Sequence, residues 1–302
     1  MREQQLYQIL SVEPAALGEG PVWDDQLNRL LWVDIVNGRI NQWYPYTEIY
    51  QSIDFPGKIG AIALMQTDTV IAATDKGFAF LNLDNGGLTY LGDPEANKEG
   101  NRFNDGKCDP RGRFWAGSLN ENEENQAAAL YMLDGLGTIT KKIDGVSCSN
   151  GMAWSLDERT FYFIDTAIRQ VVAYDCSPKS GEISNRRVVI DVDPVDGLPD
   201  GMTIDTEGML WIALWGGWKV ARWNPHTGEK LTEIKLPVSQ VTSCTFGGKD
   251  LNDLYITSAK VNLDADSLAN QPYAGCLFVV KGLFVSGCEP KRYIRWSGST
   301  PS

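Results

Sequence analysis

Short apolar runs separated by polar turns recur along the whole chain, and residues 198–217 show the unit most clearly. Two runs of strand-forming residues, Met202–Ile204 and Met209–Leu214, flank the turn Asp205–Gly208. Alternation of this kind around an Asp- and Gly-containing turn is typical of a β-hairpin. Asp200 comes just before the first run, so the pattern predicts a hairpin whose first strand begins directly after a carboxylate.

Copies of this unit recur at a regular spacing. Six strand-forming residues follow corresponding turns about 40 to 50 residues apart, namely Trp32, Ile71, Trp115, Phe163, Trp211 and Tyr255. Most copies continue into a third strand, at Arg39–Tyr44, Gly77–Leu83, Ala129–Leu133, Gln170–Asp175 and Trp218–Asn224. With one further strand after the next turn, each repeat has about four strands. This period and strand number are typical of a β-propeller blade.

The sequence therefore predicts an all-β fold, a six-bladed β-propeller with four-stranded blades around a central channel and a single domain over residues 1–302. The second copy, at Gly60–Thr74, has an irregular turn, and Asp264–Ala269 is expected to form a short helical turn. Gln4–Val12, Cys276–Lys281 and Lys291–Trp296 also have strand character. Pairing of strands from the two ends within one blade would close the ring and remove exposed edges.

Polar side chains occupy corresponding places near the first strand of four copies. They are Glu19, Asn104, Asn150 and Asp200, with a glycine close behind each. In a propeller the innermost strands border the channel, so these side chains are expected to converge. Two carboxylates and two amides without His or Cys form a hard oxygen-donor set that suits Ca²⁺, Mg²⁺ or Mn²⁺. Taken singly, each residue is equally explained as an ordinary turn former, and it is the recurrence that favours a shared site.

Composition narrows the classes of partner. The chain has 27 Lys and Arg against 39 Asp and Glu, a net charge of −12, which opposes binding to nucleic acid or an anionic membrane. Met1–Ser11 lacks the pattern of a signal peptide, and no apolar run reaches membrane-spanning length. We therefore expect a cytoplasmic protein with a small-molecule partner, as a monomer or weak homodimer.

The cysteines and the single histidine give little support for a catalytic triad or a zinc site. The six cysteines are far apart and form no Cys-x-x-Cys pair, so buried free thiols are the expected state. The single histidine, His226, lies in the turn 224–228, where exposed turn chemistry is the favoured interpretation. A Ser-His-Asp triad or a multi-histidine metal site is accordingly not expected.

Five motifs in order resemble the senescence-marker-protein, gluconolactonase and regucalcin family, with similarity from about residue 13 to residue 285. The motifs are EGPVWDD at 19–25, NRFNDGKCDPRGRFWAGS at 101–118, SNGMAWSLDERTFYFIDT at 149–166, LPDGMTIDTEGMLWIALW at 198–215 and TSCTFGG at 242–248. The resemblance implies a six-bladed propeller with one divalent cation in its tunnel that hydrolyses sugar-acid lactones such as glucono-, xylono- or arabinonolactone to the aldonic acids.

The family's residue roles are carried over position by position. The resemblance implies that Glu19, Asn150 and Asp200 bind the cation, with Ca²⁺ favoured and Mg²⁺, Mn²⁺, Zn²⁺ or Fe²⁺ as alternatives, and that Asp200 is also the catalytic base. It further implies that Arg102 and Asn104 contact substrate. An additional substrate-binding glutamate of the family aligns with Asn122, while Glu121 lies next to it, so both remain candidates.

Two other functions stay open. One is a calcium-binding regulatory protein without catalysis, although Arg102 and Asn104 would serve no purpose in a pure ion buffer. The other is a phosphotriesterase-like hydrolase, since related propellers use similar oxygen-lined metal sites. A panel of lactones and phosphotriesters would separate these possibilities.

Overall fold

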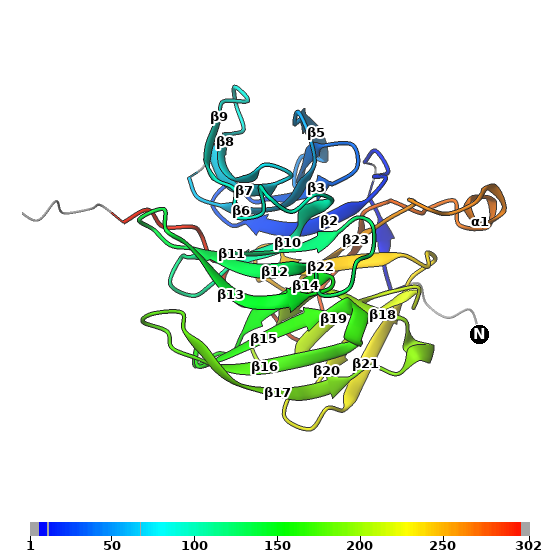
Figure 1. The fold of residues 1–302 in the computed structure, drawn as a ribbon. Helices are drawn as coiled ribbons and strands as arrows, with labels where there is room; N and C mark the ends of the chain where they lie inside the picture. Colours follow the sequence, from blue (N-terminus) through cyan, green and yellow to red (C-terminus); the bar gives the residue numbers. More distant parts are fainter. Residues whose placement is uncertain (1–5, 11, 67, 297–302) are drawn as a thin grey trace, which may run out of the picture.

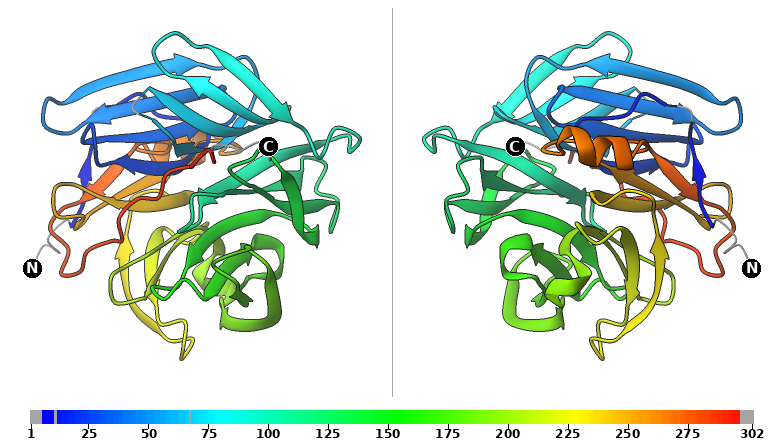
Figure 2. Two further views of the ribbon diagram at one scale, coloured as in Figure 1. Left: turned by 90° about the vertical axis from the view of Figure 1, so that its left-hand side faces the viewer. Right: turned by 90° about the vertical axis from the view of Figure 1, so that its right-hand side faces the viewer.

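The computed structural model describes residues 6–10, 12–66 and 68–296. Six four-stranded antiparallel sheets surround a common centre, and the sequence passes in order from one sheet to the next (Figure 1; Figure 2). The predicted six-bladed β-propeller is therefore confirmed. No helix in these described ranges has the length and apolar character needed to cross a membrane.

The first three blades follow one another without crossovers, each running from the innermost strand outwards. Their strands are β2 (Gly18–Asp24), β3 (Arg29–Asp34), β4 (Arg39–Tyr44) and β5 (Ile49–Asp54) in blade 1; β6 (Ile59–Leu64), β7 (Thr69–Thr74), β8 (Gly77–Asn82) and β9 (Leu88–Gly92) in blade 2; and β10 (Asn101–Cys108), β11 (Phe114–Asn120), β12 (Ala128–Leu133) and β13 (Ile139–Val146) in blade 3.

The last three blades repeat this plan, with the N-terminal strand β1 added to the sixth. Their strands are β14 (Ser149–Trp154), β15 (Thr160–Asp165), β16 (Gln170–Cys176) and β17 (Ile183–Asp191) in blade 4; β18 (Leu198–Ile204), β19 (Leu210–Trp215), β20 (Lys219–Trp223) and β21 (Lys230–Lys235) in blade 5; and β22 (Val241–Gly247), β23 (Asp253–Ser258), β24 (Phe278–Val280) and β1 (Gln8–Ile9) in blade 6. Short helices are η1 (Thr166–Ile168), η2 (Pro194–Asp196) and α1 (Ala265–Asn270).

The repeat pattern placed the strands correctly. All six spaced aromatic or branched residues lie in the second strand of a blade, and the five predicted third strands match β4, β8, β12, β16 and β20. Blade 2 is complete despite its irregular turn, of which residue 67 lies outside the described residues. The expected helical turn is α1, where the Asp264 side chain accepts a hydrogen bond from the Ser267 backbone N–H (2.8 Å).

Turns between the first and second strands are stabilised by a buried aspartate. In blade 5 the Asp205 carboxylate accepts hydrogen bonds from the backbone N–H of Met209 (3.0 Å) and from Trp211 Nε1 (2.9 Å). It also pairs with Arg222 Nε at 2.7 Å. Asp109 makes the corresponding contacts with Trp115 in blade 3. These contacts satisfy both the carboxylate and the indole N–H, which is what a buried polar group requires.

The ring closes through the N-terminal strand as predicted, whereas the strand predicted at Lys291–Trp296 is absent. Gln8 pairs with Val279, so β1 completes the blade formed by the C-terminal strands, although the described part of Gln4–Val12 forms only this short strand. Lys291–Trp296 is not a strand. Its backbone N–H groups bond to successive blades instead, from Tyr293 to the Leu64 carbonyl (2.7 Å) and from Trp296 to Gly135 (2.9 Å).

The apolar core lies between neighbouring blades. Trp211 of β19 meets Phe246 of β22 edge-on with ring centroids 5.7 Å apart. Trp23 of β2 stacks on Tyr255 of β23 at 5.6 Å, and this contact joins the last blade to the first. Because each blade is buried only against its neighbours, the closed ring is needed to hold the innermost strands in place.

Candidate functional site

A β-bulge near the beginning of each innermost strand determines where the polar side chains point. In all six blades the pairing between the first and second strands shifts at this place, and a bulge re-aims the side chains beside it. Glu19 and Asn150 flank the bulges of β2 and β14, whereas Asn104 and Asp200 lie within those of β10 and β18. The four residues thus occupy equivalent points, but inside their strands rather than ahead of them as predicted.

Blades 2 and 6 contribute no comparable side chain. Their bulges contain Gly60 and Thr242. A Cβ on Gly60 would collide with the Phe103 backbone, so a larger residue does not fit there. The Thr242 hydroxyl donates a hydrogen bond to the Gly18 carbonyl at 2.5 Å and is buried. The polar set is therefore restricted to four of the six blades.

Three of the predicted residues come together in the channel. Glu19, Asn150 and Asp200 are each 4–5% exposed. The carboxyl groups of Glu19 and Asp200 are hydrogen-bonded to each other, and Asp200 also interacts with the Asn150 side chain. Gly201, which follows Asp200, lies so close to Ser243 that a Cβ would collide with it. The backbones of blades 5 and 6 can therefore approach closely at this glycine.

Burial and mutual repulsion shift the ionisation of this group. Burial, followed by the charge of Asp105, raises the pKa of Glu19 to about 8. Burial likewise raises the pKa of Asp200 well above its usual range, and the neighbouring charges of Glu19 and Asp105 add to this effect. Carboxylates crowded in this way are unfavourable unless a positive charge compensates them.

Asn150 is oriented with its amide oxygen free. Its Nδ2 donates to Thr166 Oγ1 at 2.9 Å, and Thr166 Oγ1 in turn donates to the Pro199 carbonyl at 2.8 Å. The Asn150 Oδ1 atom is buried and has no hydrogen-bond partner among the described residues, a state that normally requires an explanation. An unpartnered amide oxygen beside two carboxylates fits a hard divalent cation.

The amide is essential to such a site. Among the described residues, no group of three or more His, Cys, Asp or Glu side chains is arranged to hold a metal ion. Glu19, Asp200 and Asn150 together offer three protein oxygen donors, which would leave further coordination positions of a cation to water or substrate. This is the open coordination expected of a catalytic metal site.

A polar rim surrounds this centre on blade 3. Arg102 Nη1 donates to Asn104 Oδ1 (2.9 Å), and Arg102 Nε donates to Glu121 Oε1 (3.0 Å). Lys58 also bonds to Glu121. Partial burial opposes ionisation of Glu121, but the hydrogen bond from Lys58 and the charge of Arg102 lower its pKa overall. The amide of Asn122 lies instead against Gly100, so Glu121 is the one of the two candidates that lies beside Arg102.

Two polar residues near the centre were not singled out from the sequence. Asp105 is buried and its charge acts on both Glu19 and Asp200. Thr166 orients Asn150 from the end of the neighbouring strand. Asp105 directly follows Asn104, which was the only available signal, whereas nothing in the sequence relates Thr166 to its partners. The cysteines are free, four of them buried, and His226 is exposed in its turn as expected.

Comparison with known proteins matches this architecture to one family. Residues 17–260 match the model of the SMP-30/gluconolactonase/LRE-like region. Regucalcin of Danio rerio is 42% identical over 284 residues, which cover 93% of this chain and 96% of that protein. YvrE of Bacillus subtilis (strain 168), by name a candidate sugar lactone lactonase, is 41% identical, with 91% of this chain and 94% of the relative covered.

Solved structures agree with this match. A calcium-binding protein, regucalcin, from Agrobacterium tumefaciens str. C58 superimposes with a TM-score of 0.90 at 29% identity, covering 94% of this chain and 96% of that one. The similarity extends over nearly the full length of both proteins, so it includes all six blades rather than a single shared motif.

Proposed function

The chain belongs to the SMP-30/gluconolactonase/LRE-like family, and from this membership we propose that it is a lactonase that hydrolyses a sugar lactone with the help of one divalent cation. The observation that carries the proposal is the meeting of Glu19, Asp200 and the unpartnered Asn150 Oδ1 in the buried centre of the channel. Relatives named as a sugar lactone lactonase and as regucalcin support it.

Glu19, Asn150 and Asp200 would hold the cation through carboxylate and amide oxygens. These are hard donors, so Ca²⁺ is the first candidate, and Mg²⁺, Mn²⁺, Zn²⁺ or Fe²⁺ are alternatives. When bound, a divalent cation supplies Lewis-acid polarisation of the lactone carbonyl and stabilises negative charge on its oxygen. The Asn150 Nδ2 group donates to the Thr166 hydroxyl, while Asn150 Oδ1 has no partner among the described residues and is available to a cation.

Asp200 is the proposed general base. Its carboxylate takes a proton from the water that attacks the lactone carbonyl carbon. The bond between that carbon and the ring oxygen then breaks, and Asp200 returns the proton it took from water to the ring oxygen, which leaves as a hydroxyl. Water is thus divided between the new carboxyl group and the new hydroxyl of the aldonic acid. The buried position of Asp200 excludes bulk water from this proton transfer.

The rim on blade 3 would bind the sugar hydroxyls. Arg102 and Glu121 offer a donor and an acceptor side by side (3.0 Å), and a polyol can exchange hydrogen bonds with both. Arg102 also holds Asn104, whose Nδ2 donates to the Ser149 carbonyl at 2.9 Å. We propose Glu121 rather than Asn122 as the additional substrate contact, because Glu121 lies beside Arg102.

Proton release from a panel of aldonolactones tests this function. Chelator-stripped protein is mixed with D-glucono-, D-xylono-, L-arabinono- or D-galactonolactone, with and without each candidate cation, and spontaneous opening is subtracted. Cation-dependent acceleration of one lactone over the others is the expected result. Cation binding without acceleration of any lactone would contradict the proposal. Phosphotriesters in the same assay distinguish a phosphotriesterase from a binding protein without catalysis.

A further inference from the structure

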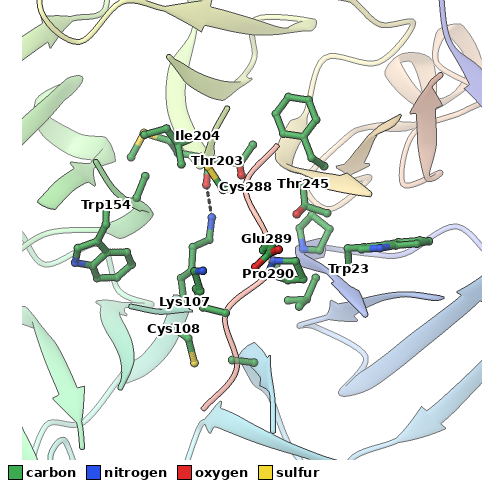
Figure 3. A pocket seen from close by; sticks show the side chains of 18 of the residues that line it. Trp23, Lys107, Cys108, Trp154, Thr203, Ile204, Thr245, Cys288, Glu289 and Pro290 are labelled. Carbon is green, nitrogen blue, oxygen red and sulfur yellow. Dashed lines mark hydrogen bonds between the residues drawn. The ribbon is translucent and has the colours of Figure 1, made fainter. Parts of the chain in front are cut away.

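A second cavity lies at the other end of the channel. Its volume is about 230 Å³, and its walls include Trp23, Trp154, Ile204 and Thr245 (Figure 3). These residues belong to the later parts of the innermost strands, whereas Glu19, Asn150 and Asp200 lie near the beginnings of theirs. Glu19 and Trp23, for example, lie at opposite ends of β2. The cavity therefore occupies the opposite part of the channel, and it extends as far as Gly20 and Asp105, beside the candidate catalytic centre.

The C-terminal segment 287–296 forms one side of this cavity. Cys288, Glu289 and Pro290 line it as the segment crosses the channel (Figure 3). The segment is anchored before and after this crossing: Gly287 N–H donates to the Leu251 carbonyl (2.7 Å), and Arg292 pairs with Asp24 at 2.7 Å. The wall is thus tied to the blades on both sides, which gives a preformed site.

Lys107 supplies the main hydrogen-bond donor of the cavity. Its Nζ reaches across to the Met202 carbonyl at 2.5 Å (Figure 3). An ammonium group has three donors, and within the described residues this carbonyl is its only hydrogen-bond acceptor. The side chain is partly accessible and lines the cavity. Burial lowers the pKa of Lys107, although the charge of Asp105 opposes this shift.

The charges around the cavity disfavour an anion as ligand. Its lining contains Asp105, Glu158 and Glu289 together with Lys107 and Lys291. Glu158 is paired with Arg111 at 2.7 Å, whereas the charge of Asp105 acts on Lys107. An added carboxylate at Lys107 would therefore lie close to Asp105 in a poorly solvated place. An uncharged carbonyl oxygen, by contrast, can accept a hydrogen bond from the lysine without adding charge.

The remaining walls are mainly apolar, although Thr203, Ser243 and Thr245 also line the cavity. The indole rings of Trp23 and Trp154 lie on different sides of the cavity, and Pro290 closes part of the gap between the blades (Figure 3). An apolar cavity with a few converging polar groups is the usual form of a small-molecule site. We propose that this cavity is a second ligand site, which takes a small, uncharged, mainly apolar molecule whose carbonyl oxygen accepts a hydrogen bond from Lys107.

Three probes of similar size test the predicted chemistry by calorimetry on the full chain: acetophenone, ethylbenzene and benzoate. Acetophenone should bind best. Ethylbenzene lacks the acceptor and should bind about tenfold more weakly, as expected for the loss of a hydrogen bond to a charged donor. Benzoate should bind weakest because its carboxylate would lie close to Asp105 in a poorly solvated place. Benzoate binding equal to or tighter than acetophenone, or no acetophenone binding, would overturn the proposal.

Two variants locate the site. Lys107→Met removes the donor and should make acetophenone and ethylbenzene bind equally. Thr245→Phe fills the cavity, retains the lysine and should abolish binding of both probes. This second variant still tests the site if Lys107→Met does not fold. Acetophenone binding unchanged by Thr245→Phe would place the ligand elsewhere and refute the proposal. Competition between acetophenone and an aldonolactone would do the same. Apart from the competition experiment, binding is measured without lactone or cation, so a failure of acetophenone to bind leaves the proposed lactonase function untouched.

Discussion

Replacing Thr166 by valine tests whether the hydroxyl of this residue orients the amide of Asn150. The substitution keeps the branched shape and removes only the hydroxyl that accepts from Asn150 Nδ2 (2.9 Å) and donates to the Pro199 carbonyl (2.8 Å). Without it, Asn150 Nδ2 keeps only the longer contact to Cys148 Sγ (3.9 Å) and its interaction with Asp200, so the orientation of the amide is less restricted. We expect the affinity for a divalent cation to fall while the fold is retained.

The size of the effect follows from the two lost hydrogen bonds. Each contributes about 0.5–1.5 kcal/mol net, and a buried donor left without an acceptor costs about 1–3 kcal/mol. Thr166 is partly exposed, so water can reach the Pro199 carbonyl and the stability loss should lie near the lower end. For the cation, loss of a residue that orients a ligand typically weakens affinity about 10- to 100-fold.

Calcium binding by calorimetry measures this directly, with Thr166→Ser as the matched control because serine retains the hydroxyl. We expect Thr166→Ser to bind Ca²⁺ within about threefold of the unaltered protein, and Thr166→Val at least about tenfold more weakly. Circular dichroism establishes that both variants are folded. Equal calcium affinity of Thr166→Val and the unaltered protein would refute the orienting role and weaken the assignment of Asn150 as a ligand.

Three further predictions concern the base, the rim and the fold. Asp200→Asn should lower kcat for the preferred lactone by at least about 100-fold; near-normal turnover with cation bound would rule out Asp200 as the base. Glu121→Gln should lower kcat/KM about tenfold or more, whereas Asn122→Asp should have little effect, and the reverse order would show that the other residue contacts the sugar. Asp205→Ala should reduce the free energy of urea unfolding by about 3–5 kcal/mol, against less than about 1 kcal/mol for the exposed Glu207→Gln; similar losses would contradict the structural role of the buried aspartate.

The repeat made much of this fold predictable. Strand positions follow from local alternation and turn chemistry. Because the same pattern recurs in every blade, the copies can be aligned on equivalent residues such as Trp115 and Trp211. The same alignment found Glu19, Asn104, Asn150 and Asp200, because equivalent positions of a propeller must converge. The strand positions and the convergence of Glu19, Asn150 and Asp200 were therefore predictable by comparing one repeat with another, whereas the roles of these residues stay predictions.

Features outside the repeat were predicted less well. The segment Lys291–Trp296 has strand character, yet its backbone bonds to several blades in turn, which local propensity cannot indicate. Thr166 acts on Asn150 and Pro199 through contacts between blades, and Lys107 donates to Met202, 95 positions along the chain. Such long-range contacts depend on the closed ring and become visible only in three dimensions.

The rate of lactone hydrolysis, measured against cation occupancy, tests the proposed metal-dependent centre most directly. Chelator-stripped protein is titrated with Ca²⁺, and binding by calorimetry is compared with proton release from the best aldonolactone of the panel. Glu19→Gln provides a variant with one carboxylate removed from the centre. We predict one cation per chain, hydrolysis that rises in proportion to occupancy, and weakened binding and hydrolysis together in Glu19→Gln. Full hydrolysis by the stripped protein, or a fully occupied protein that hydrolyses no lactone, would contradict the proposal that these residues form a metal-dependent lactonase centre.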